Sequence, residues 1–395
     1  MTRPALLGGR PAFPDGLPFV RPARPPLSAV SRRLEASYER GILTNGPLVR
    51  ELEQAVAERI GVAHAVAVAS CTSGLMLAFQ ALTAPGGRVV MPSFTFSATA
   101  HAATWAGAIP SFAECGPDDA QLDLDDAAGR VDGAAAVVGV HVFGAPCRPG
   151  PLEKLGRAAG VPVVFDAAHA FGATHEGRPI GGFGDVEVFS LSPTKPLVAG
   201  EGGLVTTADP VLAERIRLGR DYGNPGDYDT RFAGLNARMS ELHAAVALES
   251  LRDLDDHLVR RQDLADRYRH LLADLPGLRA QHVEPADRST YKDFTIIVDE
   301  NAFGVPRDSV VAALSADGVD TRCYFSPPVH RQHAHRQAEM PHLPVTDRLA
   351  STVISLPLWR SLSDDAVDGV VDVVARIHEY ADEVRESGTL ACAPS

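Results

Sequence analysis

Short apolar runs alternate with stretches of helical periodicity along most of this chain, and this alternation strongly limits what it can fold into. The apolar runs occupy residues 65–69, 88–91, 134–140, 161–165 and 186–189. Runs that are apolar at every position are typical of strands buried on both faces. Strands of this kind, separated by helices, form a parallel sheet covered by helices. We therefore predict an α/β fold with a mostly parallel sheet sandwiched by helices.

Other segments carry signals for individual helices and strands. After Thr44-Asn45-Gly46-Pro47, apolar residues recur at helical spacing until Gly61, which predicts a helix that ends there. The pattern is then continuously helical from Met239 to about Leu275. Further along, the sequence predicts strands at 291–298 and 353–356, a helix at 308–316 and a final helix after Asp364.

The chain is long enough for two domains. Its first 27 residues contain seven prolines and no long apolar block, which indicates an extended arm and not a signal peptide. We expect an N-terminal arm over 1–43, a large domain over 44–275 and a smaller α+β domain over 276–395.

Composition and charge exclude several classes of function. The 395 residues are 45% hydrophobic and 22% charged, and the formal net charge is −13. Binding to nucleic acid or to an anionic membrane needs a basic face, so we expect neither. The uncharged stretches 62–87 and 89–113 are interrupted by polar residues, glycine and proline, unlike membrane spans. The five cysteines are scattered and form no CxxC motif, which favours free thiols in the cytoplasm.

Lysine is rare in this chain. Among 37 basic residues only Lys154, Lys195 and Lys292 are lysines, and the rest are arginines. A lysine kept in such a background can serve chemistry that a guanidinium cannot, because only an amine forms an imine. Lys195 has the most suggestive surroundings, since it follows the apolar run 186–191 and precedes a glycine-rich turn at 200–203.

An acidic residue ends a neighbouring apolar run. Asp166 follows the run 161–165, and His169 comes three residues later. α/β folds place functional groups at the carboxyl ends of parallel strands. A lysine and an acid at neighbouring strand ends suit pyridoxal phosphate (PLP), because the amine binds its aldehyde and the acid keeps its ring nitrogen protonated. A helix-capping aspartate and a surface lysine would explain the same pattern equally well.

Two further segments could complete such a site. Residues 70–74, SCTSG, follow the run 65–69 and open a helix, so their N–H groups and hydroxyls could hold a phosphate. The segment contains no GxGxxG motif or Walker lysine, and an N-cap serine is the alternative interpretation. Phe94 and Phe96 follow the run 88–91 and could stack on a ring or belong to the core.

Two competing motifs have weaker support. Ser192 and Lys195 match the SxxK motif of serine β-lactamases, but no lysine here lies in the KTG box that those enzymes need. Several histidines between His330 and His342 could suggest a metal site. No cysteine and few carboxylates accompany them, so we expect no metal.

With these motifs collected, the sequence resembles the DegT/DnrJ/EryC1/StrS family of PLP-dependent sugar aminotransferases. The similarity runs from about Leu43 to Leu358. The matching segments are LTNGPLVRELE, SCTSGLMLA, MPSFTFSATAHA, HVFGAP, FDAAHAFGA, FSLSPTKPLVAGEGG, GLNARMSELHAA and ISLPLW. The resemblance implies fold type I, that of aspartate aminotransferase, with PLP and its amino form, pyridoxamine phosphate (PMP), as the cofactor.

The resemblance also implies which residues hold the cofactor. Lys195 would bind it as an imine and later carry the proton between substrate and cofactor, while Asp166 would pair with the ring nitrogen. Phe96 would stack on the ring, and His169 would lie beside its phenolic oxygen. The residues expected at the phosphate are Thr72, Ser73 and Ser190.

Other matching residues concern the substrate and the assembly. Asn236 would reach the cofactor phosphate of the neighbouring subunit, so the resemblance implies a homodimer with shared active sites. Arg238, Tyr324 and His330 would lie near the substrate. The chain departs from the common family pattern at Cys71, Ser192 and Pro196, and these departures concern the pose of the substrate more than the cofactor.

The activity implied by the resemblance is transfer of an amino group from L-glutamate to a keto sugar linked to a nucleoside diphosphate, in deoxyaminosugar or antibiotic biosynthesis. We expect amination at C4 of a dTDP-4-keto-6-deoxyhexose, with amination at C3 as a competitor. Relatives that dehydrate sugars carry histidine in place of the lysine, so Lys195 favours transamination over a PMP-dependent dehydratase. A non-catalytic PLP-binding regulator is a further alternative.

Overall fold

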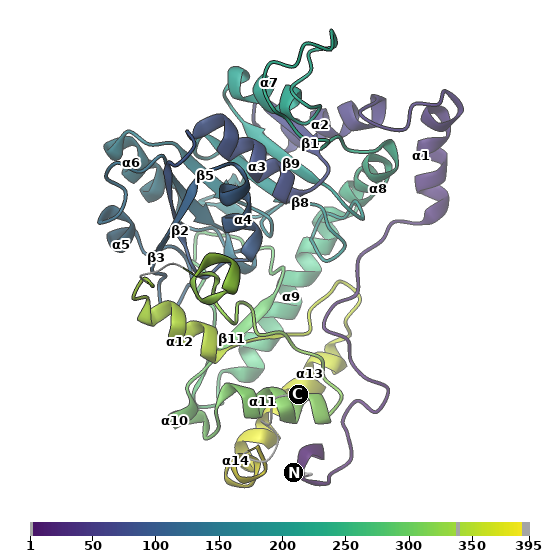
Figure 1. Ribbon diagram of the computed structural model, residues 1–395. Helices are drawn as coiled ribbons and strands as arrows, with labels where there is room; N and C mark the ends of the chain where they lie inside the picture. The colour runs from purple at the N-terminus through teal and green to yellow at the C-terminus, as the bar shows by residue number, and fades with distance from the viewer. Residues whose placement is uncertain (1–2, 337–339, 389–395) are drawn as a thin grey trace.

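A seven-stranded sheet forms the centre of the protein in the computed structural model, which describes residues 3–336 and 340–388 (Figure 1). Across the sheet the strand order is β1-β9-β8-β5-β4-β2-β3. The strands are β1 (His64–Val68), β2 (Arg88–Pro92), β3 (Ile109–Ala113), β4 (Ala136–Val140), β5 (Val163–Asp166), β8 (Val186–Ser190) and β9 (Gly203–Thr207). All neighbouring pairs from β3 to β8 are parallel, and β9 runs antiparallel between β8 and β1. The predicted α/β class is therefore confirmed.

Both faces of the sheet are buried, as the apolar runs predict. On β1, Val66 and Val68 belong to one core cluster, whereas Ala65 and Ala67 belong to a second cluster on the other face. The first face is covered by α3 (Cys71–Leu82), α4 (Ser97–Trp105) and α7 (Pro210–Gly219). The second face is covered by α2 (Pro47–Ile60), α5 (Leu124–Ala128), α6 (Pro149–Ala159) and α8 (Glu241–Arg252).

Two elements differ from what the sequence pattern predicts. Strand β3 has no continuous apolar run because Pro110 and Ser111 interrupt it, and it forms at the edge of the sheet, where proline is tolerated. The continuous helical pattern from Met239 to Leu275 forms two helices, α8 and α9 (Leu254–Leu272), with non-helical backbone at Asp253. This break lets α8 pack on the sheet while α9 extends into a third core cluster.

The third core cluster lies in the C-terminal part of the chain. The cluster includes residues of a three-stranded antiparallel sheet, which consists of β10 (Leu278–Ala280), β11 (Phe294–Val298) and β12 (Val353–Leu356). The helices of this part are α10 (Glu300–Phe303), α11 (Arg307–Ala316), α12 (Pro344–Thr352), α13 (Asp364–Glu379) and α14 (Ala381–Gly388). A short hairpin forms a separate two-stranded sheet from β6 (Thr174–His175) and β7 (Arg178–Pro179).

The N-terminal segment spans the length of the molecule (Figure 1). Its first residues lie on the third core cluster, where Phe13 and Leu17 pack and Leu17 pairs with Val319 as in a parallel strand. Further along, α1 (Leu27–Glu39) packs against α8. Residues 3–26 contain one 3-10 turn, Ala5–Leu7, and otherwise consist of turns, bends and irregular backbone. The division of the chain into an arm and two domains stays a prediction.

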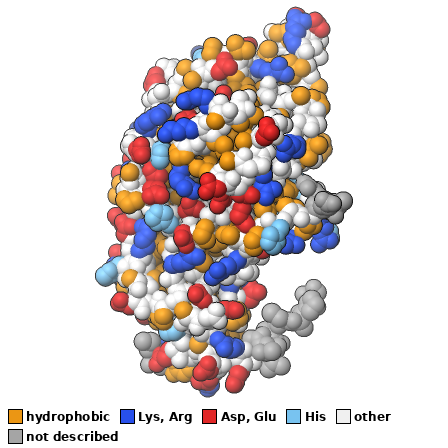
Figure 2. Space-filling model, turned by 90° about the vertical axis from the view of Figure 1, so that its left-hand side faces the viewer, with side chains coloured by type: hydrophobic (Ala, Val, Ile, Leu, Met, Phe, Trp, Pro, Cys, Tyr) orange, Lys and Arg blue, Asp and Glu red, His pale blue; other side chains and the backbone are white. Residues whose placement is uncertain are grey.

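No helix within the described ranges is both long and apolar enough to cross a bilayer. On the face shown in Figure 2, Lys and Arg side chains are interspersed with Asp and Glu side chains. The four cysteines in the described part of the chain, Cys71, Cys115, Cys147 and Cys323, are free thiols.

A buried carboxylate joins helices α1, α2 and α8. The Glu241 side chain, at the start of α8, is fully buried. Its Oε1 accepts hydrogen bonds from the backbone N–H groups of Gly46 and Val49, each at 3.0 Å, at the N-terminus of α2. Its Oε2 accepts from the N–H of Leu48 at 3.0 Å and from Ser37 Oγ at 2.8 Å on α1. The positive end of the α2 dipole stabilises the charge of this carboxylate.

Replacing Glu241 by glutamine should lower the free energy of unfolding by about 2 kcal/mol, because the amide turns one acceptor into a donor facing buried N–H groups. Denaturant unfolding followed by circular dichroism measures this change. Glu35→Gln on the exposed side of α1 is the control and should leave the unfolding midpoint unchanged. Equal midpoints for the Glu241 variant and the parent protein would show that these hydrogen bonds do not stabilise the fold.

Candidate active site

The parallel pairing of β5 and β8 brings the predicted site residues together. Asp166 ends β5 and pairs in register with Val188 on β8, and Ser190 ends β8 two residues later. A cavity of about 320 Å³ opens at these strand ends. Of the residues expected from the sequence, it is lined by Thr72, Phe96, Asp166, His169, Ser190, Lys195 and Tyr324. The structure therefore confirms that the lysine and the acid share one pocket.

Lys195 lies in the turn that follows β8. Its backbone N–H donates to the carbonyl of Ser192 at 3.0 Å, which fixes the turn. Burial, together with the positive charge of Lys292, lowers the pKa of its amine to about 8. A lysine with this pKa is neutral, and hence nucleophilic, in a much larger fraction near neutral pH than an ordinary lysine.

Two donors fix the carboxylate of Asp166. Its Oδ2 accepts from Thr99 Oγ1 at 2.7 Å, and its Oδ1 accepts from the N–H of Ala168 at 3.1 Å. Thr99 in turn shares a hydrogen bond of 2.8 Å with Thr95. Burial raises the pKa of Asp166, whereas the hydrogen bond from Thr99 lowers it. A cation placed against this buried carboxylate would favour its ionised form.

The N-terminus of α3 forms another wall of the cavity. Ser70 is the N-cap residue, since its Oγ accepts from the N–H of Ser73 at 3.1 Å, and Ser73 Oγ accepts from the N–H of Ser70 at 3.1 Å. The N-cap interpretation is thus correct for Ser70. The expected phosphate ligand Ser73 uses its hydroxyl in this capping box and does not line the cavity, whereas Thr72 does. A helix start of this kind favours an anion.

His169 and Phe96 contribute further rings to the cavity. Burial lowers the pKa of His169 well below its usual range, and the charge of Lys195 adds to this effect, so the imidazole is neutral. Phe96 stands at the rim with 59% of its surface exposed, and its ring centroid lies 6.4 Å from that of Phe325. Phe96 is therefore placed where it could cover a bound ring.

Besides Ser73, three expected residues do not reach this cavity within one chain. Asn236 is exposed, and Arg238 forms an ion pair with Asp221. His330 is fully buried elsewhere, with Nδ1 2.7 Å from Ser93 Oγ and Nε2 3.2 Å from Asp347 Oδ1. The structure thus engages both nitrogens of His330 away from the cavity, instead of presenting them to a substrate. No group of three or more His, Cys, Asp or Glu side chains within the described ranges is arranged to hold a metal ion.

Lys292 and Phe325 line the cavity although neither was expected there from the sequence. Lys292 carried a signal that could have identified it, because it is one of only three lysines. Phe325 carried none, since its place depends on the fold of the C-terminal part; its ring stacks on Phe143 with centroids 5.9 Å apart.

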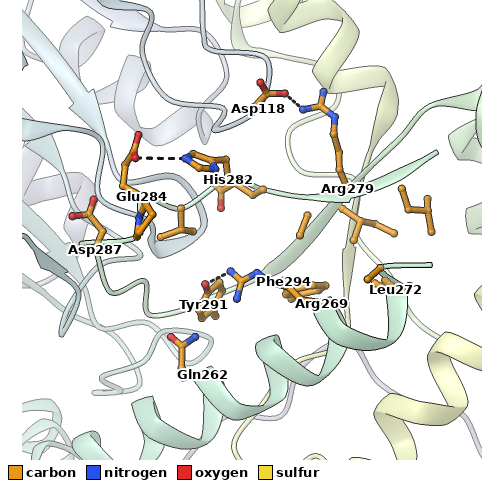
Figure 3. Close-up of a pocket in the computed structure, with 17 residues that line it drawn as sticks. Asp118, Gln262, Arg269, Leu272, Arg279, His282, Glu284, Asp287, Tyr291 and Phe294 are labelled. Carbon is orange, nitrogen blue, oxygen red and sulfur yellow. Dashed lines mark hydrogen bonds and ion pairs between the residues drawn. The ribbon is translucent and has the colours of Figure 1, made fainter. Parts of the chain in front are cut away.

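A larger surface pocket of about 770 Å³ lies beside α9 and β10 (Figure 3). Several of its polar side chains pair with one another: Arg279 with Asp118, Arg269 with the hydroxyl of Tyr291, and His282 with Glu284 at 3.6 Å. It contains neither Lys195 nor Asp166. The smaller cavity is therefore the candidate active site.

The donor set of this smaller cavity fits pyridoxal phosphate. An amine with a lowered pKa suits the aldehyde, a buried carboxylate suits the ring nitrogen, and a helix N-terminus with hydroxyls suits the phosphate. The volume of about 320 Å³ is within the range of small-molecule sites.

Comparisons with known proteins agree with this site. The family model described as the DegT/DnrJ/EryC1/StrS aminotransferase family matches residues 28–375. The crystal structure of DesI in the presence of its TDP-sugar product superposes with a TM-score of 0.90 at 40% identity, covering 98% of this chain and 99% of that chain.

Two curated relatives span similar lengths. The spore coat polysaccharide biosynthesis protein SpsC of Bacillus subtilis is 34% identical over 94% of this chain and 98% of its own length. UDP-N-acetyl-3-dehydro-alpha-D-glucosamine 3-aminotransferase of Acidithiobacillus ferrooxidans is 34% identical over 83% of this chain and 88% of its own length. The chain therefore belongs to the DegT/DnrJ/EryC1/StrS aminotransferase family, and its cofactor is pyridoxal phosphate.

Proposed function

We propose that this aminotransferase moves the amino group of L-glutamate to a nucleotide-linked keto sugar, at C4 of a dTDP-4-keto-6-deoxyhexose. The observation that carries this proposal is that Lys195 and Asp166 line the same cavity. The choice of a nucleotide sugar is supported by the similarity to DesI, whose crystal structure contains its TDP-sugar product.

In this proposal the residues of the cavity divide the work. Pyridoxal phosphate, when bound, supplies an electron sink for the pair left behind as a C–H proton is removed. The neutral amine of Lys195 would bind the cofactor aldehyde and, when free, would remove and return that proton. Asp166, whose carboxylate is oriented by Thr99, would hold the proton on the ring nitrogen.

The other cavity residues position the cofactor. Thr72, with the helix start at Ser70, and Ser190 would hold the phosphate, and Phe96 would cover the ring. The neutral His169 would lie beside the phenolic oxygen. Because Ser73 caps α3, it acts on the phosphate only by holding this helix start in place.

A homodimer is part of the proposal. Asn236 forms an isolated β-bridge with Asp221, which is also the ion-pair partner of Arg238. Because Asn236 is exposed, it is available to a second copy of the chain. We infer that it reaches the cofactor phosphate of the neighbouring subunit and that the two sites of a cytoplasmic dimer are shared.

A second candidate is amination at C3, supported by the curated relative named as a 3-aminotransferase of a UDP-linked sugar. A PMP-dependent dehydratase and a non-catalytic regulator have less support. Relatives that dehydrate carry histidine in place of Lys195, and a regulator would not need an amine whose pKa is lowered to about 8.

Lys195→Ala should abolish the visible absorbance of the lysine-bound cofactor and reduce turnover by about 10³-fold or more, because one amine both binds the aldehyde and moves the proton. Absorbance spectra and glutamate-dependent turnover measure the two effects. Lys154→Ala, an exposed lysine on α6, is the matched control and should change neither. A visible band that persists in the Lys195 variant would refute the assignment.

The substrate is tested with the parent protein, glutamate and a panel of dTDP- and UDP-linked 3-keto and 4-keto sugars. We expect an amino product from a dTDP-4-keto-6-deoxyhexose, with the amine placed at C4 by NMR. An amine at C3 would establish the second candidate. Consumption of a sugar without release of 2-oxoglutarate would establish the dehydratase, and no bleaching by any amino donor would favour the regulator.

Thr99→Val should weaken cofactor binding by about 10-fold, because the Asp166 carboxylate loses its shorter hydrogen bond in a buried site. Titration of the apo protein with pyridoxal phosphate, followed by absorbance, measures the affinity. Thr99→Ser keeps the hydroxyl and should restore it. Thr104→Val, on the exposed side of the same helix, is the control. If the valine and serine variants of Thr99 bind the cofactor equally, the hydroxyl does not position Asp166.

A further inference from the structure

The segment between β10 and β11 brings a second lysine into the active-site cavity. Lys292 lines this cavity together with Lys195 and Tyr324, and its side chain is only 5% exposed. Its positive charge is close enough to lower the pKa of Lys195. The steps proposed above give this lysine no task.

The backbone around Lys292 is held in place by long-range hydrogen bonds. The buried guanidinium of Arg261 on α9 donates to the carbonyls of Thr290 at 3.2 Å, Tyr291 at 2.9 Å and Lys292 at 2.6 Å. Thr290 Oγ1 donates to the carbonyl of His169 at 2.6 Å. The position of Lys292 is thus fixed relative to both the sheet and α9.

The ammonium of Lys292 donates hydrogen bonds to both oxygens of the Asp293 carboxylate. Its Nζ lies 2.8 Å from Asp293 Oδ1 and 3.0 Å from Oδ2. The rings of Tyr324 and Phe19 lie 5.5 Å and 5.9 Å away and offer weaker cation–π contact. An ammonium has three N–H donors, and the hydrogen bonds within the described part of the chain use two of them. One donor of Lys292 is therefore available to a bound molecule.

We propose that Lys292 binds a carboxylate of the amino donor; this inference rests on the proposed function. The α-carboxylate of an amino acid is one bond from the carbon that reacts, so its counter-ion must lie beside Lys195. The diphosphate of a nucleotide sugar lies beyond the hexose ring and is separated from the reacting carbon by several bonds. Among the described residues that line the cavity, Lys195 and Lys292 are the cationic side chains, and Lys195 is occupied by the reaction.

Asp293 makes this arrangement reversible. In the absence of donor it neutralises Lys292, so the cavity carries no unpaired buried cation, which would be unstable. When a carboxylate binds, Lys292 donates a charge-assisted hydrogen bond to it while remaining paired with Asp293. The sugar in the second half-reaction has no carboxylate, so Asp293 can again be the sole ionic partner.

Two variants separate the role of this lysine from effects on folding. Lys292→Met alone leaves Asp293 buried without its partner, so the double variant Lys292→Met/Asp293→Asn removes both charges together. Lys292→Arg keeps a cation. Lys154→Met is the matched control, because it removes an exposed lysine on α6. Thermal unfolding and the visible absorbance of the loaded protein verify that each variant folds and binds the cofactor.

The first measurement is binding of glutarate, which has both carboxylates of glutamate but no amine to react, to the PLP-loaded protein by calorimetry. The double variant should bind glutarate about 10- to 100-fold more weakly than the parent, as expected for loss of a hydrogen bond between charged groups. Lys292→Arg should retain part of the affinity, and Lys154→Met should retain all of it.

The second measurement compares the half-reactions. Bleaching of the visible band by glutamate should need about 10- to 100-fold more glutamate in the double variant. Recovery of the band when the PMP form meets the keto sugar should be unchanged. Equal glutarate and glutamate affinities in variant and parent would overturn this inference and leave the proposed function standing. A defect confined to the sugar half-reaction would also overturn it, by assigning Lys292 to the sugar nucleotide. A parent protein that no amino donor bleaches would instead refute the proposed function.

Discussion

The parallel pairing of β5 with β8 is the constraint on which the active site depends. Because both strands run in the same direction, Asp166 and Ser190 lie at the same ends of their strands, the carboxyl ends. The turn after β8 brings Lys195 to the cavity at these ends. An antiparallel neighbour at this point would have placed the acid and the lysine at opposite ends of the sheet. β9, which does run antiparallel, joins only on the far side of β8. The catalytic pair is thus a direct consequence of strand direction.

Burial and pairing act in opposite directions on the charged groups of this cavity. Burial lowers the pKa of Lys195 and raises that of Asp166, so both effects favour the neutral forms. The hydrogen bond from Thr99 favours the ionised carboxylate. The cavity therefore provides an amine with a lowered pKa beside a carboxylate that a cation can ionise, which is the combination that PLP chemistry requires.

Local sequence patterns predicted those parts of the structure that depend on neighbours in the chain. The apolar runs gave β1, β2, β4, β5 and β8. Asp166 was found because it directly follows such a run, and Lys195 because lysine is rare and this one lies a few residues after another run. Strand β3 was missed because an edge position tolerates Pro110, and edge positions are not visible in a single strand's sequence. Ser73 was assigned to the phosphate from the family resemblance, and only the folded structure shows its hydroxyl within the capping box.

Contacts between distant segments explain the other differences. His330 lies in a loop that could face the cavity or the core, and its bonds to Ser93 and Asp347 draw it into the core. Lys292 reaches the cavity because Arg261 and Thr290 tie its segment to α9 and to the residues after β5. Sequence patterns therefore predicted Asp166 and Lys195, which follow the neighbouring central strands β5 and β8. Lys292 and Phe325 reach the cavity from the C-terminal part, so only the folded chain reveals these two residues.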